Sequence, residues 1–247
     1  MRYFIHLAYK GTKYHGWQIQ PNAITIQEIL QKNLSILLKK DTEIIGAGRT
    51  DTGVHASFFI AHFNSIGEID TNKICLALNR MIPNDIVIYS IFKVSEDAHS
   101  RFSAISRTYK YYISKIKNPF TLETSSYVWG TLDIEMMNEA SKILFEYIDF
   151  TSFSKLHTDT ATNNCTITKA EWNIDENQKL VFTISADRFL RNMVRAIVGT
   201  MLEIGRGKIS LDDFRAIIES KDRSKAGMSA SPEGLFLVDI QYNFPLL

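Results

Sequence analysis

The feature that most constrains the fold is a polar, glycine-punctuated stretch at residues 46–56. It reads GAGRTDTGVHA and separates two apolar runs, at residues 44–45 and 58–60. Apolar runs on either side of a turn predict two strands joined by a loop. The three glycines permit positive φ and a close approach of the backbone to a ligand. Arg49 and Asp51 lie within this loop, and charged loop residues on a rigid scaffold often carry function.

Three other interpretations fit part of this loop. Residues 46–48 begin like a dinucleotide-binding fingerprint, but G-x-G-x-x-G requires glycine where the chain has Asp51. Residues 51–53 spell the Asp-Thr-Gly triplet of aspartic peptidases, whose chemistry needs two carboxylates that share a proton. The nearest second triplet is Asp-Thr-Ala at residues 159–161, so a peptidase would have to be a symmetric dimer. The third interpretation is a surface turn with an Arg–Asp pair, which contributes little stability.

Composition indicates a soluble globular chain. Its 247 residues are 45% hydrophobic and 22% charged, which is ordinary and sufficient for one large or two modest domains. No run approaches the roughly 18 apolar residues of a membrane helix, and the N-terminal MRYFIH predicts a strand rather than a signal peptide. We therefore expect no membrane partner. Cys75 and Cys165 lie far apart without metal-ligand spacing, which favours a reducing, cytoplasmic setting.

Two α+β halves are expected, at residues 1–104 and 105–247, with antiparallel sheets flanked by helices. Capping patterns mark helix starts at Thr25, Asp133 and Ser210. Residues 106–114 alternate strictly, which predicts a strand with Tyr109 and Tyr111 on one face. An active loop in the first half implies a cleft between the halves. The other expected elements are strands at residues 2–9, 85–94 and 235–241, helices at 25–37, 71–80, 133–145 and from about 189, and a hairpin of 165–174 with 180–186.

Arginines gather on the helix expected from about residue 189. The net charge of +1 argues neither for nor against RNA, since a nucleic-acid binder needs only a local basic surface. Arg188, Arg191 and Arg195 are spaced three and four apart, opposite a broad apolar face. They form either a rail for phosphates or a solvated helix face.

A loop rich in glycine and aromatic residues follows the first strand. It reads YKGTKYHGWQ at residues 9–18. Tyr14 and Trp17 form either a small core beneath this loop or a surface that contacts RNA.

Residues 48–56, GRTDTGVHA, resemble the catalytic loop of the TruA family of tRNA pseudouridine synthases, in which the aspartate is essential. YKGTKYHGWQ is similar to the first motif of that family, which favours RNA contact by Tyr14 and Trp17. Two departures stand out: TNNCTI at 162–167 lacks an Arg that relatives often carry, which removes one expected RNA contact, and SASPEGL replaces the usual APPEGL. The similarity continues through SRFSA at 100–104, RTYKY at 107–111, DFTSF at 149–153, RNMVRAIVG at 191–199 and PEGL at 232–235.

The resemblance implies isomerisation of uridine to pseudouridine at positions 38, 39 and 40 in the anticodon arm of tRNA. Asp51 is the implied catalytic carboxylate and Arg195 its implied salt-bridge partner. One carboxylate can attack C1′, attack the uracil ring or remove the 2′ proton. Tyr109 is expected to stack on the flipped target base. Arg49 is expected to fill the vacated space or hold a phosphate, and Arg101 to contact the RNA backbone.

The implied reaction adds and removes nothing and changes no oxidation state. That agrees with a chain that has no cofactor fingerprint and no metal-spaced ligands, so we expect no cofactor and no metal. The implied partner is tRNA, the implied assembly is a homodimer, and the implied fold has two ferredoxin-like or RRM-like halves. His55 is expected to be a neutral residue that stabilises its own loop, because nothing pairs it with a nucleophile.

Two rivals come from other classes: a non-catalytic RNA-binding module of the sheet-platform kind and the aspartic peptidase. A binding module gives no reason to place Asp51 in a basic cleft, since a carboxylate repels phosphate. Peptidase loops usually carry apolar residues just before the aspartate, where this chain has Gly-Arg-Thr.

Overall fold

The computed structural model describes residues 1–155 and 162–246, which form two compact units. The first comprises Met1–Ile105 and Phe236–Leu247, and the second comprises Ser106–Leu235. The boundary at residue 105 lies one residue from the expected one. The C-terminal segment differs, because it belongs to the first unit, whereas the expected second half extends to residue 247. Both units mix strands and helices, so the α+β class is confirmed.

The sheet of the first unit has the strand order β4-β1-β3-β9, with β2 added to β3. β1 pairs antiparallel with β3 and β4, but β9 lies parallel to β3, with His55 opposite Phe236. This corrects the expectation of purely antiparallel sheets. Parallel neighbours need a long connection, and the chain between β3 and β9 contains the whole second unit. The strands are β1 (Arg2–Tyr9), β2 (Ile45–Gly46), β3 (His55–Asn64), β4 (Ile86–Val94) and β9 (Leu235–Tyr242).

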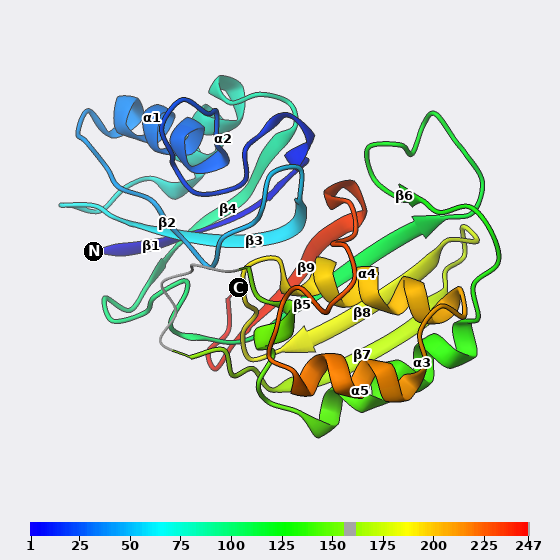
Figure 1. Ribbon diagram of the computed structural model, residues 1–247. Helices are drawn as coiled ribbons and strands as arrows, with labels where there is room; N and C mark the ends of the chain where they lie inside the picture. The colour runs from blue at the N-terminus through cyan, green and yellow to red at the C-terminus, as the bar shows by residue number, and fades with distance from the viewer. Residues whose placement is uncertain (156–161, 247) are drawn as a thin grey trace. The chain divides into compact units, whose positions relative to one another are not determined.

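Two helices, α1 (Ile26–Leu38) and α2 (Thr71–Met81), cover one face of this sheet (Figure 1). Thr25 caps α1 as expected, because its side chain accepts the N–H of Glu28 at 3.3 Å. The side chain of Asp70 caps α2 in the same way. A 3₁₀ helix, η1 (Gly11–Lys13), follows β1.

The ring of Phe4 ties β1 to the C-terminal segment of the first unit. Its centroid lies 5.7 Å from that of Tyr242 and 6.1 Å from that of Phe244. Phe4 itself is fully buried. The neighbouring Tyr3, on the opposite face of β1, stacks on Phe63 at 5.6 Å. β1 is therefore packed on both faces, which explains its largely apolar sequence.

The sheet of the second unit has β8 at its centre, paired antiparallel with β5 on one side and β7 on the other. The two-residue β6 adds parallel to β5, with Ile113 opposite Ser126. Every residue of β8 is buried, as expected for a central strand. The predicted hairpin of residues 165–174 with 180–186 is confirmed, although its first strand begins at Ile167. The strands are β5 (Ala104–Ser114), β6 (Ser126–Tyr127), β7 (Ile167–Ile174) and β8 (Leu180–Ala186).

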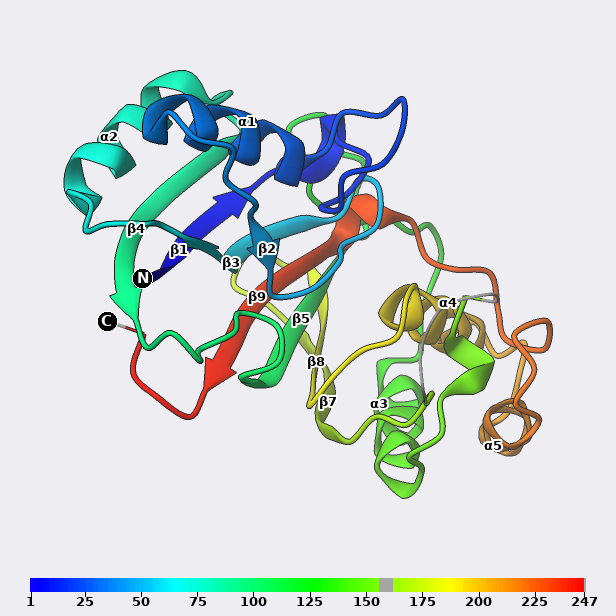
Figure 2. The same ribbon diagram turned by 90° about the vertical axis from the view of Figure 1, so that its left-hand side faces the viewer.

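Helices α3 (Ile134–Ile143) and α4 (Met193–Gly205) lie on one face of this sheet, and α5 (Leu211–Glu219) lies beside α3 (Figures 1 and 2). Asp133 caps α3, and Ser210 with Asp213 forms a reciprocal capping box at the start of α5. Both caps were readable in the sequence. Three 3₁₀ helices complete the unit: η2 (Leu144–Glu146), η3 (Thr151–Phe153) and η4 (Pro232–Gly234).

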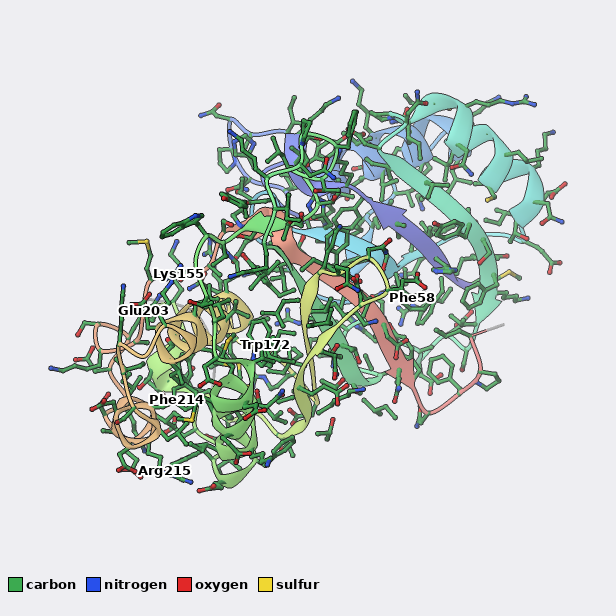
Figure 3. The ribbon with its side chains drawn as sticks, turned by 90° about the vertical axis from the view of Figure 1, so that its right-hand side faces the viewer. Phe58, Lys155, Trp172, Glu203, Phe214 and Arg215 are labelled. Atoms are coloured by element: carbon green, nitrogen blue, oxygen red, sulfur yellow. The ribbon has the colours of Figure 1, made fainter. Side chains whose placement is uncertain are left out.

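Trp172 joins the strands of the second unit to its helices. Its ring stacks on Phe182 of β8 at 4.8 Å, and its Nε1–H donates to Sδ of Met201 in α4 at 3.3 Å. Figure 3 shows Trp172 between the strands and the helices, and Phe214 on α5. Among residues 1–155 and 162–246, no helix is both long and apolar enough to cross a membrane.

Candidate active site

The glycine-punctuated stretch connects β2 to β3 in the first unit. Figure 2 shows this loop beside the start of β9, in agreement with the pairing of β3 and β9 there. The Ala47 N–H donates to Ile60 O at 2.8 Å and continues the ladder one residue beyond β2. Arg49 is exposed and Asp51 half-buried. The loop between β2 and β3 therefore carries both a carboxylate and a guanidinium.

The backbone before Asp51 is held by two residues of the first strand and its following loop. The carbonyl of Thr50 accepts the N–H of Trp17 at 3.3 Å. The buried hydroxyl of Thr50 lies 2.9 Å from Oη of Tyr9, within hydrogen-bond distance. Thr50 is therefore fixed through both its main chain and its side chain.

The backbone after Asp51 is held as well. The N–H of Val54 turns back to the Asp51 carbonyl at 3.1 Å, and the N–H of Gly53 donates to Tyr14 O at 3.3 Å. Gly53 has a φ of +80°, a conformation that side chains disfavour. Its glycine identity thus lets the chain reverse directly after the carboxylate.

Glycines also allow the aromatic loop to lie against the Asp51 loop. Gly16 has a φ of +83°, and a Cβ there would stand 2.2 Å from Thr50 O. A Cβ on Gly11 would stand 2.0 Å from Val54 O. Both distances are too short for any side chain, so the two loops approach backbone to backbone.

Trp17 and Tyr14 form the small core beneath the loops. Trp17 is 1% exposed and stacks on Phe59 with ring centroids 4.2 Å apart, and Tyr14 is 4% exposed. The Tyr14 hydroxyl donates to Asp85, and burial, followed by this bond, raises the pKa of Tyr14. Covered rings cannot stack on a base, so the expected RNA contact is corrected to a packing role.

His55 supports the same loop. It is fully buried, its Nδ1 accepts the N–H of Gly11 at 2.9 Å, and its ring stacks on Phe236 at 4.4 Å. An accepting Nδ1 places the ring proton on Nε2 in a neutral imidazole. The expectation of a neutral, loop-stabilising histidine agrees with this geometry.

Two further expected site residues of the first unit are exposed arginines. Arg49 Nε donates to Gln18 Oε1 at 3.1 Å, so the aromatic loop also orients this guanidinium. Arg101 lies in a turn just before the second unit, with its guanidinium carbon 5.5 Å from the ring centroid of Phe102. Both can reach a solvent-borne anion.

Tyr109 lies on β5 in the second unit, and the structure distinguishes it from Tyr111 on the same strand face. Tyr109 is half-buried and meets Phe189 edge to face, with centroids 5.1 Å apart and planes at 87°. Tyr111 is fully buried, and its hydroxyl donates to Ser231 O at 2.8 Å. Burial raises the pKa of Tyr111. Only Tyr109 of the two can offer a ring to a ligand.

Arg195 projects from α4 and binds the segment that precedes η4. Its Nε donates to Ala230 O at 2.7 Å, and its carbonyl accepts the Ala230 N–H at 2.8 Å. The same segment touches α4 at Gly199, where a Cβ would stand 1.8 Å from Met228 O. The small residue at 199 therefore permits the contact that anchors Arg195.

Arg188 and Arg191 do not share a helix face with Arg195, contrary to expectation. α4 begins at Met193, and Asn192 before it is left-handed with a φ of +68°. A left-handed residue breaks a right-handed helix, and asparagine tolerates this conformation. Arg188 and Arg191 therefore lie in the segment that leads into α4, with Arg191 exposed and Arg188 half-buried.

Sequence reasoning missed the roles of Thr50, Tyr9 and Phe189. Thr50 and Tyr9 are 41 residues apart in the chain, so no local pattern reveals their bond. Phe189 looked like part of an apolar helix face, but it contacts Tyr109 from outside that helix. The only signal for Thr50 was its place beside Asp51.

Within the described parts of the chain, no group of three or more His, Cys, Asp or Glu side chains is arranged to hold a metal ion. Residues 159–161, the nearest approach to a second peptidase triplet, lie outside the described residues. Each of the expected site residues is among the residues that the structure describes, and each lies in the unit to which the sequence assigned it.

A family model described as tRNA pseudouridine synthase matches residues 6–103 and 147–243. These segments include the Asp51 loop and the turn into α4. The chain belongs to the tRNA pseudouridine synthase family, whose members are isomerases that convert uridine to pseudouridine in tRNA.

Individual relatives are similar over nearly the whole chain, and each bears the name tRNA pseudouridine synthase A. One from Bacteroides fragilis is 60% identical over 98% of this chain and 96% of its own length. Another, from Bacteroides thetaiotaomicron, is 58% identical over 98% of this chain and 90% of its own. A third, from Thermoanaerobacter pseudethanolicus, is 40% identical over 96% of this chain and 98% of its own. This similarity confirms the resemblance to the TruA family.

Proposed function

We propose that this protein converts uridine to pseudouridine at positions 38, 39 and 40 of the anticodon stem-loop of tRNA, with Asp51 as the catalytic carboxylate. The observation that carries the proposal is the loop geometry. The residues on both sides of Asp51 are hydrogen-bonded to the loop that follows β1. A carboxylate held in this way is preorganised for chemistry rather than for packing.

The reaction breaks the C1′–N1 glycosidic bond and forms a C1′–C5 bond. The uracil loses the proton on C5 and gains one on N1, so composition and oxidation state are unchanged. A single ionised carboxylate can act in this reaction as nucleophile or as base. Arg195 is proposed as the cationic partner of the Asp51 carboxylate, and its bond to Ala230 supports this role by fixing the direction of the side chain.

Tyr109 is proposed to stack on the target uracil, which must leave the helical stack to reach an active site. Its edge-to-face contact with Phe189 fixes the plane of the ring. Arg49 is proposed to hold a phosphate or fill the space of the flipped base, and its bond to Gln18 orients the guanidinium two residues before Asp51.

Arg101, Arg188 and Arg191 are proposed to contact the tRNA backbone. All three lie outside helices and strands, Arg101 and Arg191 in turns, and these two are exposed. Turns can place a guanidinium against a phosphate without the constraint of a helix face. We further propose a homodimer that works in the cytoplasm, on the strength of the family resemblance and of the two widely spaced cysteines, Cys75 and Cys165.

Release of tritium from tRNA labelled with [5-³H]uridine tests the reaction, because C5 loses its proton only when the new bond forms. Mapping of pseudouridine in tRNA with and without the protein tests positions 38, 39 and 40. Tritium release without modification at these positions would overturn the site assignment. Cleavage of a generic peptide at acid pH without tritium release would favour the peptidase, and tRNA binding with neither activity would favour the binding module.

A further inference from the structure

The turn that carries Arg101 is closed by a histidine ring. Ser103 N–H donates to His99 O, and His99 N–H donates to Ser103 Oγ, both at 2.9 Å. The His99 Nδ1 also accepts the N–H groups of Arg101 at 3.1 Å and Phe102 at 3.3 Å. One ring nitrogen thus holds the backbone that presents Arg101.

The ring of His99 also sets the surroundings of the Arg101 guanidinium. Its centroid lies 4.5 Å from that of the His62 ring, with the planes at 67°, and 4.4 Å from that of the Phe102 ring. The guanidinium of Arg101 lies over the ring of Phe102. A shift of His99 would therefore move both the backbone and the side chain of Arg101.

The base of the turn is bonded to strands of the first unit. His62 on β3 is 1% exposed, and its Nδ1 lies 2.7 Å from Ser100 Oγ. Ser100 Oγ lies within 2.9 Å of Ile45 O on β2, the strand that leads to Asp51. The Tyr242 hydroxyl on β9 donates to Ser100 O at 2.6 Å. The turn is thereby anchored to the sheet that carries the active loop.

We propose that His99 is a positioning residue: its neutral ring holds the 99–103 turn in the form that presents Arg101 to the tRNA backbone, and its protonation in mild acid releases that turn. The inference rests on the proposed contact between Arg101 and tRNA.

The protonation of His99 depends on the charged and titratable groups that face it. They are Arg2 on β1, His62 on β3 and Arg101 in the turn itself, and the exposed carboxylate of Asp97 interacts with Arg2. A protonated Nδ1 cannot accept two N–H groups.

Burial, then Arg2 and Arg101, lowers the pKa of His99 from its ordinary value of 6.5. Burial, then His99 and Arg2, lowers the pKa of His62 to about 4. A lowered pKa in the closed turn means that proton binding favours the open turn. The turn is therefore fully closed at pH values above the ordinary histidine pKa of 6.5, and the closed form loses stability as the pH falls below that value.

Equilibrium binding of an unmodified tRNA transcript, with kcat and KM for pseudouridine formation, tests the role in three variants. His99→Asn keeps an acceptor oxygen near the position of Nδ1 but does not titrate, His99→Leu removes the acceptor, and Arg101→Ala removes the guanidinium. We expect His99→Leu and Arg101→Ala to weaken binding to a similar extent, roughly tenfold, the usual scale for a charged hydrogen bond. The loss should appear in KM rather than in kcat.

His99→Asn should bind like the wild type at about pH 7.5 and more tightly than the wild type at about pH 5.5. The double variant of His99→Leu with Arg101→Ala should bind no more weakly than Arg101→Ala alone, because both changes remove one contact. If His99→Leu does not fold, the comparison of His99→Asn with the wild type across pH decides the question alone.

Wild-type affinity in His99→Leu beside weak binding in Arg101→Ala would overturn the positioning role and leave the Arg101 contact standing. Identical pH profiles for the wild type and His99→Asn would also overturn it. Wild-type affinity in Arg101→Ala would instead refute the proposed Arg101 contact, and the positioning role with it.

Discussion

At the scale of single residues, hydrogen bonds on both sides of Asp51 restrict its backbone. Thr50 before it is bonded at both carbonyl and hydroxyl, and Gly53 after it adopts a positive φ. Fixing a residue costs about 1–2 kcal/mol in backbone entropy. The hydrogen bonds of Tyr9, Tyr14 and Trp17 offset that cost before any substrate binds.

Asp51→Asn is expected to abolish pseudouridine formation while leaving the fold intact. The substitution keeps size and most hydrogen-bonding geometry but removes the charge of the proposed catalytic carboxylate. Tritium release from labelled tRNA measures the activity, and a thermal melt measures the fold.

The exposed carboxylate of Asp41 in the same unit supplies a matched control, since Asp41→Asn should retain full activity. A folded Asp51→Asn protein that works within about tenfold of the wild-type rate, or about 1.4 kcal/mol in barrier, would show that Asp51 is not the catalytic group.

Tyr109→Ala is expected to lose both binding and turnover, whereas Tyr109→Phe should bind nearly normally. Base–aromatic stacking contributes roughly 1–3 kcal/mol, and only the alanine variant removes it. Dissociation constants and single-turnover rates for both variants separate stacking from any role of the hydroxyl. Tyr127→Phe, on a half-exposed ring of the same unit, is the control. Near-wild-type activity in both Tyr109 variants would exclude Tyr109 as the stacking residue.

At the scale of elements, α4 matters chiefly as the support of the 228–231 segment. Almost every residue of the helix is buried. The backbone of Met228 crosses it directly above Gly199, and Ala230 exchanges two hydrogen bonds with Arg195. The helix, the segment and the arginine therefore form one cooperative structure.

Gly199→Ala is expected to lower the melting temperature by a few degrees and to reduce kcat/KM. Alanine would gain about 1 kcal/mol of helix propensity, but its Cβ would stand 1.8 Å from Met228 O. Overpacking of this kind costs about 1–3 kcal/mol and would displace the segment that anchors Arg195. Gly67→Ala, where a Cβ meets nothing within 4 Å, is the control for both measurements. A melting temperature equal to that of the wild type would show that the 228–231 segment accommodates the added Cβ without a loss of stability.

At the scale of the whole molecule, a net charge of only +1 means that the proposed binding of tRNA depends on local basic groups rather than on the total charge. Association with a polyanion releases counterions, so affinity should fall steeply with salt in proportion to the number of phosphates contacted. Arg188 and Arg191 precede α4, so they can follow a phosphate backbone independently of Arg195.

The double variant Arg188→Ala with Arg191→Ala should flatten the slope of log affinity against log salt by roughly one to two units. The identity of the modified uridines should not change, because phosphate contacts carry no sequence information. Filter binding at several salt concentrations gives the slope. Lys32→Ala with Lys73→Ala, on exposed helix positions of α1 and α2, removes the same charge elsewhere. Equal slopes in the two double variants would show that Arg188 and Arg191 are solvated surface residues that do not contact phosphates.

The local features of this protein were determined by its sequence, because each depends on residues a few positions apart. The caps at Thr25, Asp133 and Ser210, the hairpin of β7 and β8, and the loop that holds Asp51 were all predicted correctly. The resemblance also identified the family, which the comparisons confirmed.

The features that only the tertiary structure decided depend on residues far apart in the chain. Periodicity predicted a long helix from residue 189, but the left-handed Asn192 makes α4 begin at Met193. Arg188 and Arg191 are thereby separated from Arg195. The family resemblance favoured RNA contact at Tyr14 and Trp17, but both rings are buried, and the ring of Trp17 stacks on Phe59. β9 belongs to the first unit, where it pairs with β3, about 180 residues earlier in the chain. Helix periodicity and composition are averages over a local window, whereas burial and strand pairing are set by whichever distant segment packs there.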